Sequence, residues 1–206
     1  MMRRHPAAVL APVALLVAAT TLLGACGDDS SPYGGRSTTT AAAGETGGTS
    51  TTGADEPPEA FAALSAAFAP ALDELGLELT RASVARLESG THIALYGVPA
   101  AGDDSPQDYL DRLLPSTVAA GTIAFDTYGA VNSFDICQEP TGTTDDEPPP
   151  VTIVVLTRDA WESVPDWTDA DLTDLLEATS SGGMAQIEVT DEISELPEYE
   201  AAASEA

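Results

Sequence analysis

Hydrophobic periodicity, the pattern that predicts helices and strands, begins only near Glu59 and ends near Thr190. The segment before Glu59 is rich in Ser, Thr, Gly and Ala, and such a segment cannot bury enough apolar surface to offset the entropy lost on folding. From Asp191 the chain is acidic and rich in Ala, which also predicts disorder. The expected parts are a signal peptide at residues 1–25, a tether at residues 26–58, one domain at residues 59–190 and a disordered tail at residues 191–206.

The first 25 residues have the three parts of a secretory signal peptide. Arg3 and Arg4 supply a basic start, an apolar run follows from Ala7, and small residues precede Cys26. The alternative is an uncleaved transmembrane helix. The run is borderline in length for a span, contains Pro12, and is followed by acidic residues instead of a basic cluster. These features favour a signal that is removed.

The junction Leu23-Gly24-Ala25-Cys26 resembles the lipobox of bacterial lipoprotein precursors, and the composition resembles that of lipoproteins from high-GC bacteria. The resemblance implies that a diacylglycerol is attached to the Cys26 thiol, that the chain is cut before this residue, and that the new N-terminus is acylated, with palmitate as an expected acyl group. It therefore implies a location at the cell membrane, with the domain lipid-anchored on the extracytoplasmic face. No domain family is identified by the residues after Cys26.

Acidic residues dominate the charge of the chain. The sequence has seven arginines, no lysine and 34 acidic residues, a formal net charge of −27, which becomes −29 when Arg3 and Arg4 leave with the signal. Nucleic-acid binding requires clustered positive charge, so it is excluded as a function. The expected partners are the membrane, through lipid on Cys26, and a basic protein or cell-envelope component. A solvated acidic surface on a soluble monomeric domain is the simpler interpretation.

Sequence patterns predict the elements of the domain in order. Apolar residues from Phe61 to Leu75 recur at helical spacing, with Pro70 expected to kink that helix. Residues 77–98 predict a β-hairpin with a bulge near Thr80-Arg81, and Ser105 is the expected N-cap of a second helix that Pro115 ends. The later segments are a short strand or helix at residues 123–125, strands at residues 131–138 and 151–157, a helix capped by Thr168 with Asp171 in its capping box, and a strand at residues 185–189.

This order predicts an α+β fold, in which a mostly antiparallel sheet of about five strands carries two or three helices on one face. Residues 151–157 are apolar on both alternating sets of positions, which is typical of a central strand. A domain of this length needs no metal or disulfide to fold.

Few residues in the chain are candidates for chemistry. His92 is the only histidine after the signal and lies within a predicted strand, so a structural role is favoured over a general base. With Cys26 lipidated, no disulfide scaffold is expected; Cys137 is interpreted as a small buried residue, with a reactive thiol as the alternative. The runs Asp103-Asp104 and Asp145-Asp146-Glu147 lack the ligand spacing of a calcium loop, so no metal or cofactor is predicted.

Two classes of function remain. The favoured one is a non-catalytic binding or interaction module, because the residues that usually carry catalysis are missing or isolated in the sequence. The alternative is a carboxylate-dependent hydrolase acting on cell-wall glycans, for which no pair of acids can be named among so many. The solute-capturing lipoprotein of a transporter has a similar anchor plan, but this domain is small for two lobes.

Overall fold

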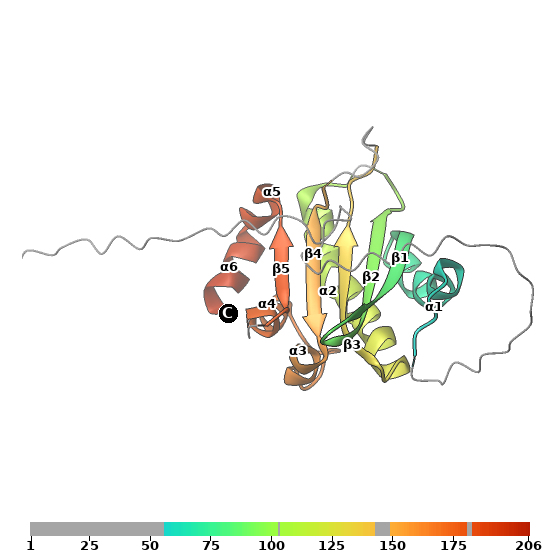
Figure 1. Ribbon diagram of the computed structural model, residues 1–206. Coiled ribbons are helices and arrows are strands. Elements are labelled where there is room, and N and C mark those ends of the chain that lie inside the picture. The colour runs from blue at the N-terminus through green and yellow to red at the C-terminus, as the bar shows by residue number, and fades with distance from the viewer. Residues whose placement is uncertain (1–55, 103, 143–148, 181–182) are drawn as a thin grey trace, which may run out of the picture.

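A five-stranded sheet forms the centre of the domain in the computed structural model, which describes residues 56–102, 104–142, 149–180 and 183–206 (Figure 1). The expected lipobox and most of the expected tether lie outside these residues. The strands are β1 (Leu77–Leu87), β2 (Gly90–Pro99), β3 (Val131–Gln138), β4 (Thr152–Thr157) and β5 (Gln186–Val189), adjacent in that order. All neighbouring pairs are antiparallel except β2 and β3, which run parallel. The predicted α+β class, with its mostly antiparallel sheet, is confirmed.

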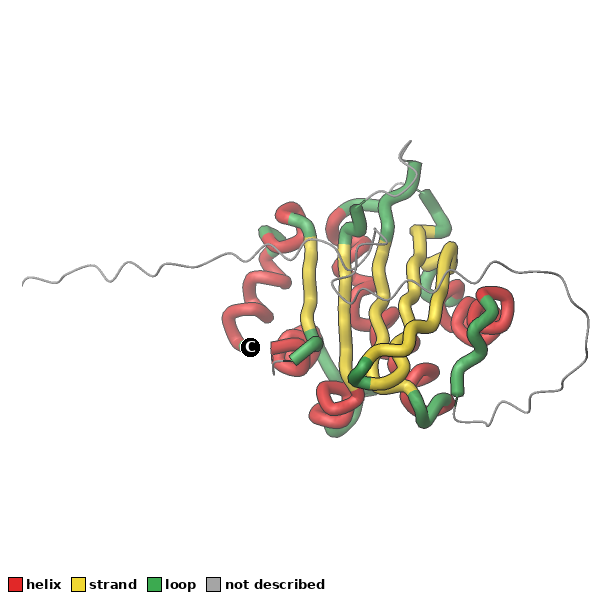
Figure 2. The backbone as a smooth tube through the Cα atoms, in the orientation of Figure 1, coloured by secondary structure: helices red, strands yellow, loops and turns green. Residues whose placement is uncertain are grey.

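Helices connect and flank the strands (Figure 2). They are α1 (Phe61–Asp73), α2 (Pro106–Gly121), the π-helix η1 (Thr122–Thr127), α3 (Arg158–Ser163), α4 (Leu172–Ser180), α5 (Asp191–Ser194) and α6 (Pro197–Glu205). The described residues thus form six α-helices, more than the two or three predicted. Two of the additional helices lie in the acidic C-terminal segment.

The prediction of a disordered tail from residue 191 is wrong. Residues 191–194 and 197–205 form α5 and α6, and α6 packs against α4. Ile193 is fully buried, Ala202 is buried, and the half-buried ring of Tyr199 packs against the core. This burial raises the pKa of the Tyr199 hydroxyl. The few apolar side chains in an acidic segment are therefore enough to dock it.

The second helix begins as predicted but extends further. Ser105 and Asp108 form a capping box, and hydrogen bonds from the hydroxyl and backbone N–H of Ser105 hold the pKa of the Asp108 carboxyl below its usual value. Pro115 lies inside α2 without ending it. The helix continues directly into η1, so residues 123–125, for which both strand and helix were open, are π-helical.

Two other local predictions have different outcomes. The register of β1 against β2 shifts between Leu79 and Arg81, which confirms the predicted bulge. The helix expected from Thr168 begins instead at Leu172. Asp171 Oδ1 accepts the N–H groups of Thr173 and Asp174, and Asp174 Oδ2 accepts the N–H of Asp171, so the capping arrangement lies three residues further along the chain.

The main core lies between one face of the sheet and the helices, and aromatic rings fill its centre. Phe125 of η1 meets Phe134 of β3 edge-on at 5.4 Å between ring centroids, and lies 5.7 Å from Trp161 of α3. The Trp161 ring also occupies the space above Gly121, where a Cβ atom would lie 2.2 Å from Cζ3 of Trp161. The end of α2 can approach α3 this closely only with glycine at position 121.

We expect Gly121→Ala to lower the free energy of unfolding by about 1–3 kcal/mol, because the added methyl group overpacks the core against Trp161. Urea unfolding followed by circular dichroism measures the effect. In a Trp161→Leu background the same substitution should cost less, since the contacted ring is gone. An equal cost in both backgrounds would show that the Trp161 contact is not its cause.

Candidate functional site

The sheet has a second face, opposite the main core, towards the viewer in Figure 1, where α2 lies behind the strands. Its apolar side chains form a small separate cluster of Cys137, Ile153 and Val155, with Tyr96 packed against it. Within the described residues, the helices contribute to the main core and not to this cluster. This face carries the polar site described next.

His92 lies at the centre of a three-residue hydrogen-bond chain on the second face. The parallel register of β2 and β3 places it directly beside Ser133. His92 Nδ1 is 2.9 Å from Ser133 Oγ, and His92 Nε2 is 3.0 Å from Asp135 Oδ2. The side chains of His92 and Asp135 are 13% and 6% exposed, and Ser133 is 2% exposed. The structural histidine expected from sequence thus has a buried serine and a buried carboxylate as its partners.

The chain has one direction when Asp135 is ionised and the His92 ring is neutral. An ionised Asp135 carboxylate can only accept hydrogen bonds, so the proton of a neutral His92 ring belongs on Nε2. Nδ1 then presents a lone pair, and the Ser133 hydroxyl is the group that donates to it. The order is therefore hydroxyl donor, imidazole, carboxylate acceptor.

A bulge at the start of β3 aims Ser133 at His92. Thr91 pairs with Val131 and His92 pairs with Ser133, so Asn132 is an extra residue on β3. In a regular strand Val131 and Ser133 would point to the same face. Because of the bulge, Val131 lies in the main core while Ser133 reaches the second face.

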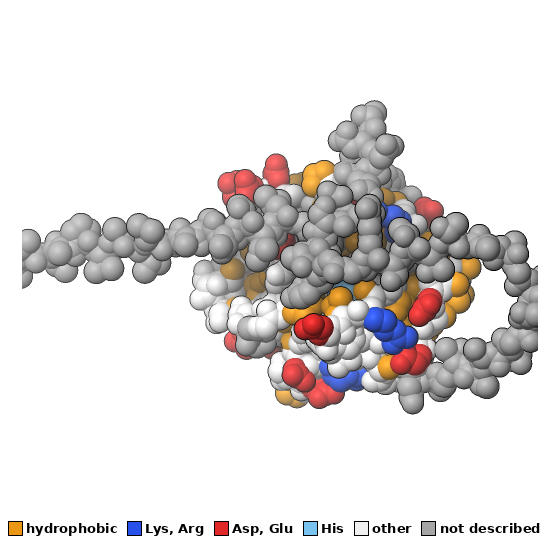
Figure 3. Space-filling view, in the orientation of Figure 1, with side chains coloured by type: hydrophobic (Ala, Val, Ile, Leu, Met, Phe, Trp, Pro, Cys, Tyr) orange, Lys and Arg blue, Asp and Glu red, His pale blue; other side chains and the backbone are white. Residues whose placement is uncertain are grey.

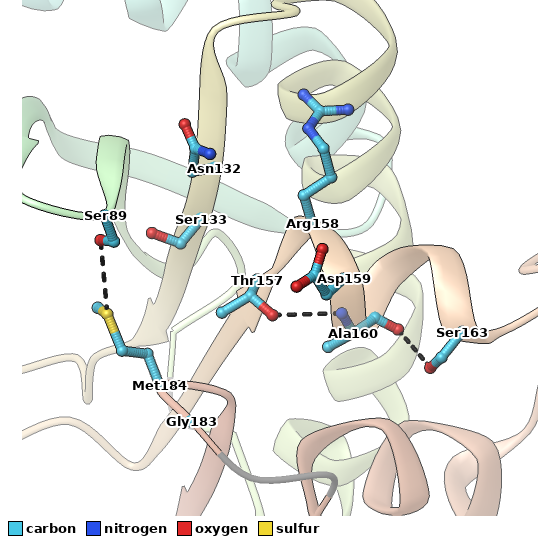
Figure 4. A pocket seen from close by; sticks show the side chains of 10 residues that line it. All are labelled: Ser89, Asn132, Ser133, Thr157, Arg158, Asp159, Ala160, Ser163, Gly183 and Met184. Carbon is cyan, nitrogen blue, oxygen red and sulfur yellow. Dashed lines mark hydrogen bonds between the residues drawn. The ribbon is translucent and has the colours of Figure 1, made fainter.

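Ser133 also lines a shallow hollow of about 520 Å³ at this end of the sheet (Figure 4). Most of the residues that line it have polar side chains, with Asp159 as the single carboxylate. Across the hollow, Ser89 Oγ lies 3.8 Å from Met184 Sδ. The other lining residues used below are Asn132, Thr157 and Arg158.

Arg158 lines the hollow, but its guanidinium is hydrogen-bonded to backbone carbonyl groups between Phe125 and Val131. Its guanidinium donates to the carbonyl oxygens of Phe125, Tyr128, Gly129 and Val131, at 2.8–3.4 Å. The same group lies 4.9 Å from the centre of the Phe125 ring. Its charge therefore stabilises the end of η1 and the turn into β3.

The candidate metal ligands are not brought together. Asp104 pairs with Arg112, whose Nε donates to Gln138 Oε1 at 3.3 Å. Among the described residues, no group of three or more His, Cys, Asp or Glu side chains could hold a metal ion. Asp103 and the run Asp145-Asp146-Glu147 lie outside those residues, as does Cys26. Cys137 is fully buried, as predicted for a small core residue. It is disulfide-bonded and not a free thiol, so the expectation that it takes no part in a disulfide is wrong.

Ser133 and Asp135 are site residues that sequence reasoning missed. They are 41 and 43 residues from His92, so no local motif joins them. The available signal was a pair of polar residues two positions apart in a predicted strand, Ser133 and Asp135, which places both on one face.

Comparison with known proteins identifies no relative: no family, curated protein or solved structure matches the chain.

Proposed function

We propose that the chain is a lipoprotein anchored to the cell membrane through lipid on Cys26, with its domain held on the extracytoplasmic face as a binding or interaction module. The lipobox-like junction supports the anchor, and the apolar run before it supports export. No helix of the described residues is long and apolar enough to cross a membrane.

Contacts at the start of the described chain indicate that the tether joins the domain at one defined place, beside β1. Glu56 forms an ion pair with Arg86 of β1 at 2.5 Å, and a second carboxylate, Glu59, lies 3.9 Å from the same guanidinium. Pro57 between them is buried. Tension from the anchor would thus act on the end of β1.

The pairing of the arginines is the observation that carries the interaction role. Each of the four arginines in the described chain is engaged within the domain. Arg81 pairs with Glu139 and lies 4.2 Å from the Tyr96 ring centre; the others are Arg86 with Glu56, Arg112 with Asp104, and Arg158 with backbone carbonyls. The remaining surface charge is consequently carboxylate, carried by acidic side chains scattered over the face shown in Figure 3, and it favours a basic partner.

No specific observation favours the alternative of a carboxylate-dependent glycan hydrolase. That chemistry uses two acids facing each other across the substrate. The lining of the hollow contains one, Asp159.

We expect Cys26→Ala to abolish incorporation of labelled fatty acid and to release the protein from the membrane fraction or leave it as precursor, because the acceptor thiol is gone. Mass spectrometry of the mature N-terminal peptide is the second readout. Since Cys26 and Cys137 are the only cysteines, a lipid on Cys26 and a bond between the two exclude each other. A lipid-modified Cys26 peptide supports the anchor; a Cys26–Cys137 crosslinked peptide, or labelling that persists in the variant, contradicts it.

The acidic surface predicts that the mature protein binds a basic oligolysine peptide at low salt, with a dissociation constant that rises steadily with ionic strength. Isothermal titration between 20 mM and 300 mM salt, values chosen to span roughly 20 to 6 Å in screening length, measures this. An oligoglutamate peptide of equal length is the matched control. Affinity independent of salt would contradict an electrostatic interaction surface.

A further inference from the structure

We propose that Ser133, His92 and Asp135 form an acyl-transfer site that hydrolyses carboxylic esters entering the hollow. Ser133 is the nucleophile, His92 the general base, and Asp135 a positioning residue. This activity goes beyond the proposed binding role and does not depend on the anchor, so the two proposals fail separately.

The first argument is the direction of the hydrogen-bond chain. A serine becomes a nucleophile when an adjacent base can take its proton, and the base must be oriented by a third group. Nδ1 of His92 faces the Ser133 hydroxyl at 2.9 Å, and Nε2 is held by Asp135 at 3.0 Å. Such triads are defined by the roles of their groups. Here the ring nitrogens are exchanged relative to the common triad, since Nδ1 faces the serine and Nε2 the carboxylate, but nucleophile, base and orienting acid are all present.

The second argument is preorganisation. All three residues lie on two paired strands in the middle of the sheet, so their backbone positions are fixed by the ladder. The near-complete burial of Asp135 strengthens its interaction with the imidazolium that forms when His92 takes a proton. The bulge at Asn132 is the feature that brings Ser133 to this face, and bulges are over-represented beside active sites.

The hollow defines the substrate class. Ser133 is almost fully buried but lines the hollow, so a substrate carbonyl reaches its Oγ from there. Asn132 and Thr157 also line it, and their amide and hydroxyl groups are the side-chain donors available to a carbonyl oxygen. The polar lining and the acidic protein favour an ester with a small acyl group on a polar alcohol that is uncharged or cationic.

The proposed reaction balances without a cofactor. Ser133 Oγ forms a bond to the ester carbonyl carbon while its proton moves to His92 Nδ1. The carbon–oxygen bond to the alcohol breaks, and the alcohol leaves with that proton. Water then attacks the acyl-serine, gives its proton to His92 Nδ1, and releases the carboxylic acid as Ser133 regains its hydrogen.

The test uses the mature protein in detergent with two probes, a fluorophosphonate that labels nucleophilic serines and 4-nitrophenyl acetate as a small ester. We expect one covalent adduct, mapped to Ser133, and ester turnover that Ser133→Ala abolishes. His92→Gln should slow labelling by roughly 100-fold or more, the usual scale of a lost general base. Asp135→Asn should lower kcat with little change in KM, which a merely structural role would not produce. Ser83→Ala, an exposed serine on β1 away from the hollow, is the matched control.

Activity is compared only among variants that unfold cooperatively when heated, as measured by circular dichroism. Ser133→Ala removes only one oxygen atom, so it is the variant expected to keep the wild-type fold. Absence of labelling and turnover in folded wild-type protein overturns the proposal. So does an adduct on another serine, or turnover retained in folded Ser133→Ala. Should His92→Gln fail to fold, the adduct position and Ser133→Ala still decide the question.

Discussion

The parallel pairing of β2 with β3 organises this domain. Parallel strands cannot be joined by a tight turn, so the chain must cross over the sheet between them. α2 and η1 supply that crossover on one face, and the main core forms beneath them. The other neighbouring pairs are antiparallel, and α3 and α4 lie between β4 and β5. In the described part of the chain no helix packs against the apolar cluster of the second face. The same pairing sets His92 beside Ser133.

The register of β3 against β2 requires the crossover to end at a fixed position along the β2 strand. Arg158 at the end of β4 binds four carbonyl oxygens between Phe125 and Val131, where η1 turns into β3. Phe125 and Trp161 pack over the same turn, and Gly121 leaves room for the Trp161 ring. One cation and one aromatic cluster therefore hold the residue before the bulge in place. Because the bulge at Asn132 directly follows Val131, the position of Val131 in the core also determines where Ser133 lies on the opposite face.

Local patterns predicted the fold class well and the tertiary relations poorly. Alternation in residues 77–98 predicted a hairpin with its bulge near Thr80, and Ser105 predicted a capped helix start, because these signals act over a few residues. α5 and α6 were missed because acidic composition hides the few apolar residues, such as Ile193, that dock them. These two helices are stabilised by packing against α2 and α4, which are distant in the sequence, and no local pattern indicates such contacts.

The site was predicted in part for the same reason. His92 was placed correctly within a strand, and two buried side chains are its partners there. Ser133 and Asp135 could not be assigned to it, since their proximity requires the parallel register and an extra residue, Asn132, in β3. The sequence shows which residue types are present, but only the sheet topology shows that these three side chains are in contact.

The central claim is that the chain Ser133–His92–Asp135 has a fixed direction, and the protonation of the His92 ring tests it most directly. His92 is the only histidine after residue 5, so a ¹⁵N-labelled mature protein gives one set of imidazole signals in long-range ¹H–¹⁵N spectra at neutral pH. The account predicts a proton held on Nε2 and a bare Nδ1, with a change at Nδ1 in Ser133→Ala. A proton on Nδ1, or a ring that averages between both tautomers as a solvent-exposed histidine does, would contradict it.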